Sequence, residues 1–264
     1  KDNQERFWCR EYNRRLMARS TRLTKRQKRV LRQQGLLDES NRVSSKFRLI
    51  DLESKFNLTS TQQQVIDAYD NGNHLVLHGL AGTGKTFLST YLALGEIQDG
   101  VYEKLHIIRS AVPTRDIGFL PGNSKQKIQV YEDPYRQICS ELYGRGDAYE
   151  ILTQKNYVEF VSTSFIRGTT FRNSIILVDE INNMNFHELD SVITRVGPNC
   201  RIILCGDYRQ TDLRSSDERA GLKQFLKILN NIESFTHFEF GIEDIVRSGI
   251  VKEYIIGKTE AGYV

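Results

Sequence analysis

The sequence lacks any apolar run that approaches the roughly 18 residues of a membrane-spanning helix. Its four cysteines form no CxxC pair and have no companion histidines at metal-ligand spacing, which argues against a structural zinc site. Repeats and low-complexity tracts are absent as well. With 39% hydrophobic and 27% charged residues, the composition is that of an ordinary globular protein. We therefore expect a cytoplasmic protein with no membrane partner.

The positive charge of the chain is concentrated near its N-terminus. Residues 1–48 hold 15 Lys and Arg against 5 Asp and Glu, whereas the remainder has 22 basic and 28 acidic residues. Residues 5–34 contain no Gly or Pro, and apolar side chains recur among the basic ones as on an amphipathic helix. We therefore predict a basic helical extension over 1–48, followed by a separate domain over 49–264.

Short apolar runs rich in β-branched residues alternate with helical stretches beyond residue 50. Runs such as Ile175-Ile176-Leu177-Val178 are continuously apolar, which is typical of a parallel sheet covered by helices on both faces. The sequence therefore predicts an α/β fold with a doubly wound, mostly parallel sheet that binds ligands at the carboxyl ends of its strands. The predicted strands are 74–78, 105–109, 158–162, 175–179, 202–205 and 235–240.

The strongest motif is Gly79-Leu80-Ala81-Gly82-Thr83-Gly84-Lys85-Thr86, which fits G-x-x-x-x-G-K-T between a predicted strand and a helical stretch. Glycines let the backbone N–H groups curl around phosphates at a helix N-terminus. Lys85 then reaches the β and γ phosphates of ATP, and the Thr86 hydroxyl takes a Mg²⁺ position. A simple Gly-rich turn with a surface lysine fits this context poorly. The predicted nucleotide-binding residues are Gly79, Ala81, Gly82, Thr83, Gly84, Lys85, Thr86 and Phe87.

Two acids, Asp179 and Glu180, end the apolar strand that begins at Ile175. Asp179 at the strand tip can hold Mg²⁺, as a Walker B acid does. Glu180 is placed to orient and activate the attacking water. The alternative is a solvated strand end, but a P-loop in the same sheet disfavours it. A second acid here favours hydrolysis of ATP over transfer of its phosphate to a small substrate.

Two glutamines complete the predicted site. Gln210 lies in Gly206-Asp207-Tyr208-Arg209-Gln210, after another strand, where it could contact the γ-phosphate or its water; an ordinary polar loop is the alternative. Gln62, before the P-loop, could pair with adenine N6 and N7; the alternative is a helix N-cap at Thr59 or Ser60 followed by an ordinary glutamine. The order of these motifs resembles that of superfamily 1 helicases, whose motor domains are RecA-like P-loop NTPases.

Several further segments resemble the PhoH family of P-loop ATPases, over about residues 58–256. They include Gly118-Phe119-Leu120-Pro121-Gly122, Asp133-Pro134-Tyr135 and Asp244-Ile245-Val246-Arg247. Ser110 stands where the family has proline, and Asn182 where it has glutamine. The resemblance implies ATP hydrolysis with Mg²⁺ and a homo-oligomeric ring, with a hexamer expected.

Fast hydrolysis needs an arginine that contacts the γ-phosphate. A full helicase supplies such arginines from its second domain, which a single RecA-like domain lacks. We expect a neighbouring subunit to supply the arginine, with Arg247 as the first candidate before Arg167 and Arg109. Each of these could instead be a surface ion-pair residue.

The use of the ATP is less constrained by the sequence. Two segments could contact single-stranded RNA or DNA. One is the basic N-terminal segment, which contains Phe7, Trp8 and Tyr12 among its basic residues. The other is the 116–135 region, which contains Phe119, Lys125, Lys127, Tyr131 and Tyr135. A docking helix and a packed connecting loop are the respective alternatives. We expect a nucleic-acid-dependent, helicase-like ATPase, with an ATP-switched assembly protein as the alternative and a P-loop kinase as a third, disfavoured class.

Overall fold

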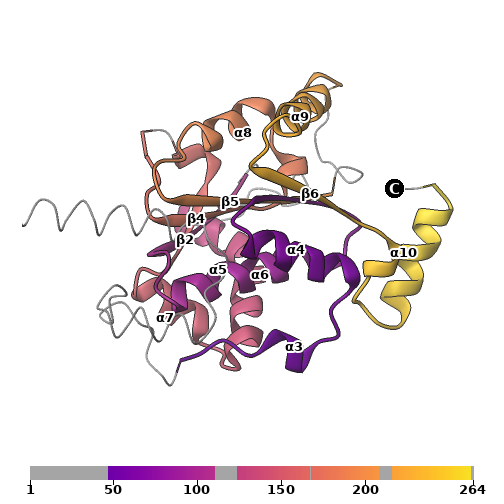
Figure 1. The fold of residues 1–264 in the computed structure, drawn as a ribbon, viewed down its shortest axis with the longest axis horizontal. Coiled ribbons are helices and arrows are strands. Elements are labelled where there is room, and N and C mark those ends of the chain that lie inside the picture. The colour runs from indigo at the N-terminus through magenta and orange to yellow at the C-terminus, as the bar shows by residue number, and fades with distance from the viewer. Residues whose placement is uncertain (1–46, 111–123, 167, 208–215, 263–264) are drawn as a thin grey trace, which may run out of the picture.

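The computed structural model describes residues 47–110, 124–166, 168–207 and 216–262 (Figure 1). In this part of the chain six strands form one sheet with the order β3-β2-β4-β5-β1-β6, and all its pairings are parallel. The predicted strands are confirmed with small shifts at their ends. They are β1 (His74–Gly79), β2 (Lys104–Arg109), β3 (Val158–Ser162), β4 (Ser174–Val178), β5 (Cys200–Gly206) and β6 (Phe235–Phe240).

Helices cover both faces of this sheet, as the sequence predicts. Figure 1 shows α4 to α7 on one face, α8 and α9 on the other, and α10 beyond the end of β6. The helices are α3 (Leu52–Lys55), α4 (Ser60–Asp70), α5 (Lys85–Gln98), α6 (Ser124–Tyr143), α7 (Ala148–Gln154), α8 (Phe186–Ile193), α9 (Ser216–Leu229) and α10 (Ile250–Glu260). Short 3₁₀ turns are η1 (Thr163–Phe165), η2 (Ile181–Asn183) and η3 (Ile242–Asp244).

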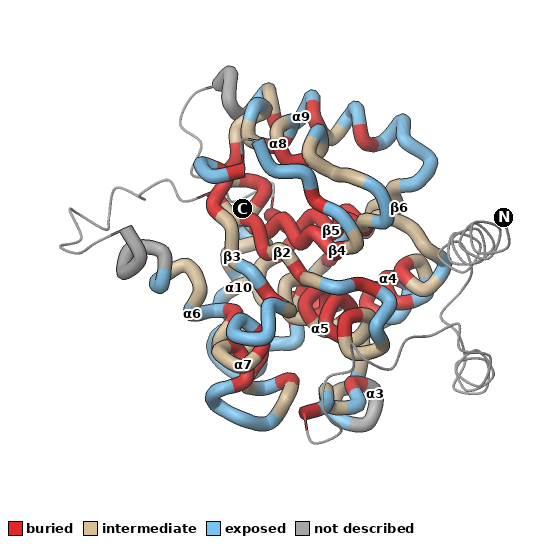
Figure 2. The backbone as a smooth tube through the Cα atoms, turned by 90° about the vertical axis from the view of Figure 1, so that its left-hand side faces the viewer, coloured by how far each residue is buried: buried red, intermediate tan, exposed pale blue. Residues whose placement is uncertain are grey.

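Two hydrophobic cores flank the sheet, and β4 contributes to both. Ile175 and Leu177 pack in the core shared with α4 to α7, whereas Ile176 and Val178 pack in the core shared with α8 and α9. Successive side chains of a strand point to opposite faces, so a strand covered on both sides must be apolar at every position. Figure 2 shows the resulting buried centre beneath more exposed helices.

The stretch after β2 differs from the predicted loop. Residues from Ser124 onward form α6, a helix that runs through Pro134 to Tyr143. Tyr135 in this helix has no exposed surface, so of the two alternatives for this residue the packed one is confirmed and contact with single-stranded nucleic acid is not. Phe119 lies outside the described residues, as do residues 1–46 of the N-terminal extension predicted over 1–48.

Among the helices of the described ranges, none is long and apolar enough to cross a membrane.

Candidate nucleotide-binding site

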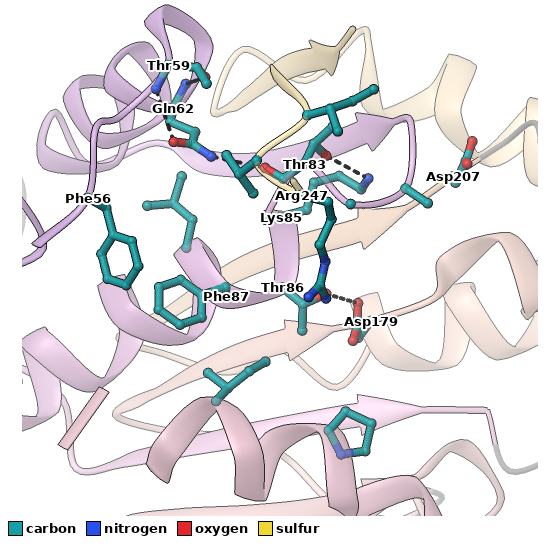
Figure 3. A pocket seen from close by; sticks show the side chains of 18 of the residues that line it. Phe56, Thr59, Gln62, Thr83, Lys85, Thr86, Phe87, Asp179, Asp207 and Arg247 are labelled. Atoms are coloured by element: carbon teal, nitrogen blue, oxygen red, sulfur yellow. Dashed lines mark hydrogen bonds between the residues drawn. The ribbon is translucent and has the colours of Figure 1, made fainter. Parts of the chain in front are cut away.

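A cavity of about 1300 Å³ opens at the carboxyl ends of β1, β4 and β5, which are neighbours in the sheet (Figure 3). The loop from β1 to α5 forms its floor, and the segment after β6 forms part of its wall. Ligands of open α/β sheets bind at this edge. The cavity therefore lies where the sequence predicts it, and its lining includes the predicted Ala81, Gly82, Thr83, Gly84, Lys85, Thr86 and Phe87.

Glycines set the shape of the loop between β1 and α5. Gly84 is the N-cap of α5 and has a left-handed backbone with φ 81°, a conformation that costs other residues energy. Gly79 ends β1 so close to β6 that an added Cβ would lie 2.3 Å from the Phe240 carbonyl oxygen. A side chain at Gly79 would therefore separate β1 from β6, which carries Phe240 beside the loop.

Lys85 is nearly buried at the first position of α5. Its Nζ donates hydrogen bonds to the carbonyl oxygens of Gly79 at 2.9 Å and Leu80 at 2.7 Å, and to the Thr83 hydroxyl at 3.2 Å. Burial lowers its pKa from the ordinary value, while nearby acids, Asp207 among them, oppose this. The amine thus points into the loop whose backbone N–H groups would hold phosphates.

Asp179 follows β4 directly and is almost fully buried. Its Oδ1 accepts a hydrogen bond from the Thr86 hydroxyl at 3.0 Å, and its Oδ2 accepts one from the Tyr135 hydroxyl at 2.7 Å. The structure thus brings together the two predicted metal residues, Thr86 and Asp179. Tyr135 is a third participant that the sequence does not indicate.

Glu180 has a left-handed backbone with φ 55° that turns its side chain into the cavity lining. Such a backbone is uncommon for a residue with a Cβ and often occurs at functional sites. Burial raises the pKa of Glu180 from its ordinary value, and the charge of Asp179 adds to this rise. Arg109 at the end of β2 opposes the rise, with its Nη2 3.8 Å from Glu180 Oε1.

Asn182 links the acid pair to the end of β5. Its Oδ1 accepts a hydrogen bond from the Asp207 backbone N–H at 3.0 Å, and its side chain is buried. Gly206 allows this approach, because a Cβ there would lie 2.8 Å from the same oxygen. Gln210 lies outside the described residues, so its role stays a prediction.

Gln62 takes part in the helix cap that the sequence offered as the alternative to adenine contact. It is the third residue of α4 and forms a capping box with Thr59, in which each side chain bonds the other's backbone N–H. Its Nε2 also donates to the Thr83 carbonyl oxygen at 3.0 Å. The capping alternative is therefore confirmed, while adenine contact stays a prediction. Phe56 and Phe87 line the cavity nearby, with ring centroids 5.5 Å apart.

Arg247 lies beside the P-loop of its own chain. The backbone N–H of Val246 donates to the Gly82 carbonyl oxygen at 3.1 Å, and a Cβ on Gly82 would lie 3.0 Å from Arg247 Cγ. Asp244 holds the preceding turn by accepting a bond from the Gly241 N–H at 3.0 Å. This geometry places Arg247 beside the P-loop of its own chain, while its supply by a neighbouring subunit stays a prediction. Arg167 lies outside the described residues.

The oxygen atoms around Thr86 suit a hard cation. A hydroxyl and a carboxylate, with remaining positions open to phosphate and water, are the ligands that Mg²⁺ takes in nucleotide sites. Elsewhere in the described residues no group of three or more His, Cys, Asp or Glu is arranged to hold a metal. The Thr86 hydroxyl and the Asp179 carboxylate fit Mg²⁺ by the chemistry of their oxygen atoms.

The strand–loop–helix unit around Lys85, in a parallel sheet of this order, places the protein among the P-loop NTPases. Within that class the chain belongs to the PhoH family, whose sequence model, described as PhoH-like protein, matches residues 56–257. The resemblance seen in the separate motifs is confirmed.

Curated relatives agree with this assignment, and a solved structure shares the fold. A PhoH-like protein of Synechocystis sp. is 32% identical over 201 residues, which cover 75% of this chain and 60% of that protein. One of Bacillus subtilis is 28% identical over 198 residues, covering 75% and 61%. The chain thus spans less than two thirds of these relatives. The large terminase of a thermophilic bacteriophage shares the fold, with a TM-score of 0.52 and 10% identity over 77% of this chain and 50% of the terminase.

Proposed function

We propose that the protein hydrolyses ATP with Mg²⁺ in the cavity at the carboxyl edge of the sheet. The observation that carries the proposal is the grouping of Lys85, Thr86, Asp179 and Glu180 around one loop and helix N-terminus, with Thr86 Oγ 3.0 Å from Asp179 Oδ1. These are the parts that phosphoryl transfer to water requires: a phosphate cradle, a cation, metal ligands and an acid that directs the nucleophile.

Each side chain has a distinct task in this mechanism. The loop N–H groups and Lys85 hold the phosphates, and Lys85 exchanges its bonds to Gly79 and Leu80 for phosphate oxygens. Thr86 and Asp179 would hold Mg²⁺, which would neutralise charge that develops on the phosphates. Glu180 orients the attacking water and accepts its proton. Gln210 senses the γ-phosphate.

The adenine lies near Gln62 in this proposal. The Gln62 amide already bonds Thr59 and Thr83, but an amide oxygen has a second lone pair and its NH₂ a second hydrogen. It can therefore contact adenine without leaving the P-loop. Phe56 and Phe87 offer aromatic surface on the same side of the cavity.

Arg247 is the arginine that we assign to the γ-phosphate, acting within its own chain. Its Cγ lies against Gly82, and its exposed side chain extends over the P-loop (Figure 3). Positive charge placed there stabilises the negative charge of the transition state. A homo-oligomeric ring, with six subunits as the expected number, remains part of the proposal.

Hydrolysis is proposed to serve work on single-stranded RNA or DNA in the cytoplasm. Family membership and the order of the motifs, shared with superfamily 1 helicases, support this proposal, as does the basic segment 1–48. The alternative is an assembly protein switched by ATP, without movement along a strand. The acid pair Asp179-Glu180 disfavours a kinase, which would phosphorylate an acceptor instead of releasing phosphate.

Release of phosphate from ATP and Mg²⁺, measured with and without single-stranded RNA and DNA, tests the proposal. We expect turnover that rises with nucleic acid and that Lys85→Ala removes, because the ammonium no longer reaches the phosphates. A slow rate indifferent to both strands would favour the assembly protein. Full turnover by folded Lys85→Ala would refute the site.

A further inference from the structure

The two oxygens of Asp179 have different partners, and only one of these would itself coordinate Mg²⁺. The Thr86 hydroxyl donates to Oδ1, and under the proposed function its lone pairs would face the cation while its hydrogen stays on Oδ1. Tyr135 donates to Oδ2 at 2.7 Å from the opposite side. The bond from Tyr135 can therefore persist with Mg²⁺ in place, and it orients the carboxylate through the oxygen that Thr86 does not contact.

The environment of Tyr135 fixes it as a hydrogen-bond donor. The side chain has no exposed surface, and its ring lies 6.0 Å from that of Phe160 on β3. Its hydroxyl lies 2.7 Å from Asp179 Oδ2, and because a carboxylate oxygen accepts hydrogen bonds, the phenol is the donor. A buried O–H beside a carboxylate has one favourable orientation, toward the carboxylate oxygen.

The backbone that carries Tyr135 is equally constrained. Tyr135, Cys139 and Leu142 occupy successive positions on one face of α6, and all three are fully buried. The neighbouring Pro134 lines the nucleotide cavity. Tyr135 therefore reaches Asp179 from a packed helix and not from a loop, which makes the distance between them reproducible.

We propose that Tyr135 is a positioning residue that holds the Asp179 carboxylate in the orientation required for Mg²⁺, and thereby sets the affinity of the site for the metal. Residues that bond a metal-binding carboxylate from behind commonly alter metal affinity when they are removed. The inference deepens the proposed function and rests on it, because it assumes that Asp179 serves Mg²⁺ bound with ATP.

A second buried tyrosine in the same core provides a matched control. Tyr69 is 1% exposed and donates its hydroxyl to Glu96 Oε2 at 3.1 Å, and neither Tyr69 nor Glu96 lines the nucleotide cavity. Tyr69→Phe and Tyr135→Phe therefore remove the same chemical group from the same kind of contact. Only the second change touches the metal site.

The experiment measures binding of a fluorescent, non-hydrolysable ATP analogue in EDTA and across a titration of MgCl₂, without any turnover. We expect Tyr135→Phe to raise the Mg²⁺ concentration for half-maximal enhancement of binding by about 10- to 100-fold. Binding in EDTA and the Tyr69→Phe titration should match wild type. In Asp179→Asn the enhancement should be largely lost, and adding Tyr135→Phe should change it no further.

The outcomes separate the two claims. If wild-type binding does not depend on Mg²⁺, the proposed function fails and the role of Tyr135 fails with it. If wild type depends on Mg²⁺ but Tyr135→Phe titrates like Tyr69→Phe, the proposed function stands and the inference is overturned. Tyr135→Met, which also lacks the hydroxyl, replaces Tyr135→Phe in the same comparison if the latter does not fold.

Discussion

Arg247 lies against the P-loop of its own chain, whereas from the sequence we expect a neighbouring subunit to supply it. Its position follows from two backbone contacts: Leu80 N–H to Phe240 O at 3.0 Å, and Val246 N–H to Gly82 O at 3.1 Å. These contacts join the segment after β6 to the P-loop within one chain. The arginine is thus held by the same loop whose ligand it would contact.

Mixing two inactive variants distinguishes action within a chain from action between chains. Arg247→Ala should lower kcat by about 10³-fold, because the γ-phosphate loses a cation, and Lys85→Ala should remove turnover. If Arg247 serves its own chain, co-assembled mixtures of the two variants stay inactive, since no chain has both residues. Recovery of a substantial share of wild-type turnover in the mixture would show that Arg247 acts on a neighbour.

Single residues also mark the limit of the sequence analysis. Lys85 and Thr86 belong to one contiguous motif, and Asp179 follows a recognisable strand, so their convergence could be predicted. Tyr135 is 44 positions from Asp179, and nothing in its local sequence indicates their bond. The sequence shows Asn182 only as a departure from the family pattern. It does not indicate that the Asn182 side chain accepts a hydrogen bond from the Asp207 backbone N–H.

At the scale of elements, the strands were predictable and α6 was not. Strands buried on both faces are continuously apolar, so β4 and β5 stand out in the sequence. In α6 the pair Asp133-Pro134 favours a turn, since proline removes a helical hydrogen bond. The helix continues because Tyr135 and Cys139, one turn apart, are buried in the core. Tertiary packing thus outweighs local preference.

The start of α5 allows a prediction about the stability of an element. In Gly84→Ala the alanine must adopt a left-handed backbone with φ 81°, and its Cβ would lie 3.3 Å from Gln62 Nε2. We expect a loss of about 1–2 kcal/mol in the free energy of unfolding, measured by urea denaturation without nucleotide. Gly257→Ala is the control, because Gly257 is exposed in α10 with no atom within 4 Å of the added Cβ. It should gain up to about 1 kcal/mol, and equal losses in both variants would contradict the account.

At the scale of the whole molecule, three adjacent strands deliver the parts of one site. The order β4-β5-β1 places the Asp179-Glu180 pair, the Gly206-Asp207 pair and the P-loop side by side at one edge of the sheet. Segments about a hundred residues apart in sequence therefore meet in a single cavity. The sheet order brings them together, which is why the motifs could be found in the sequence but their mutual geometry could not.

The central claim is that this edge of the sheet hydrolyses ATP with Glu180 as the acid that activates water. The most direct test compares Glu180→Gln with Glu141→Gln, a matched change of an exposed acid on α6 that lines the same cavity. Steady-state phosphate release and MgATP affinity are measured for both variants. We predict that Glu180→Gln lowers kcat by about 10²- to 10⁴-fold with MgATP binding retained, and that Glu141→Gln resembles wild type. Wild-type turnover in Glu180→Gln would contradict the account.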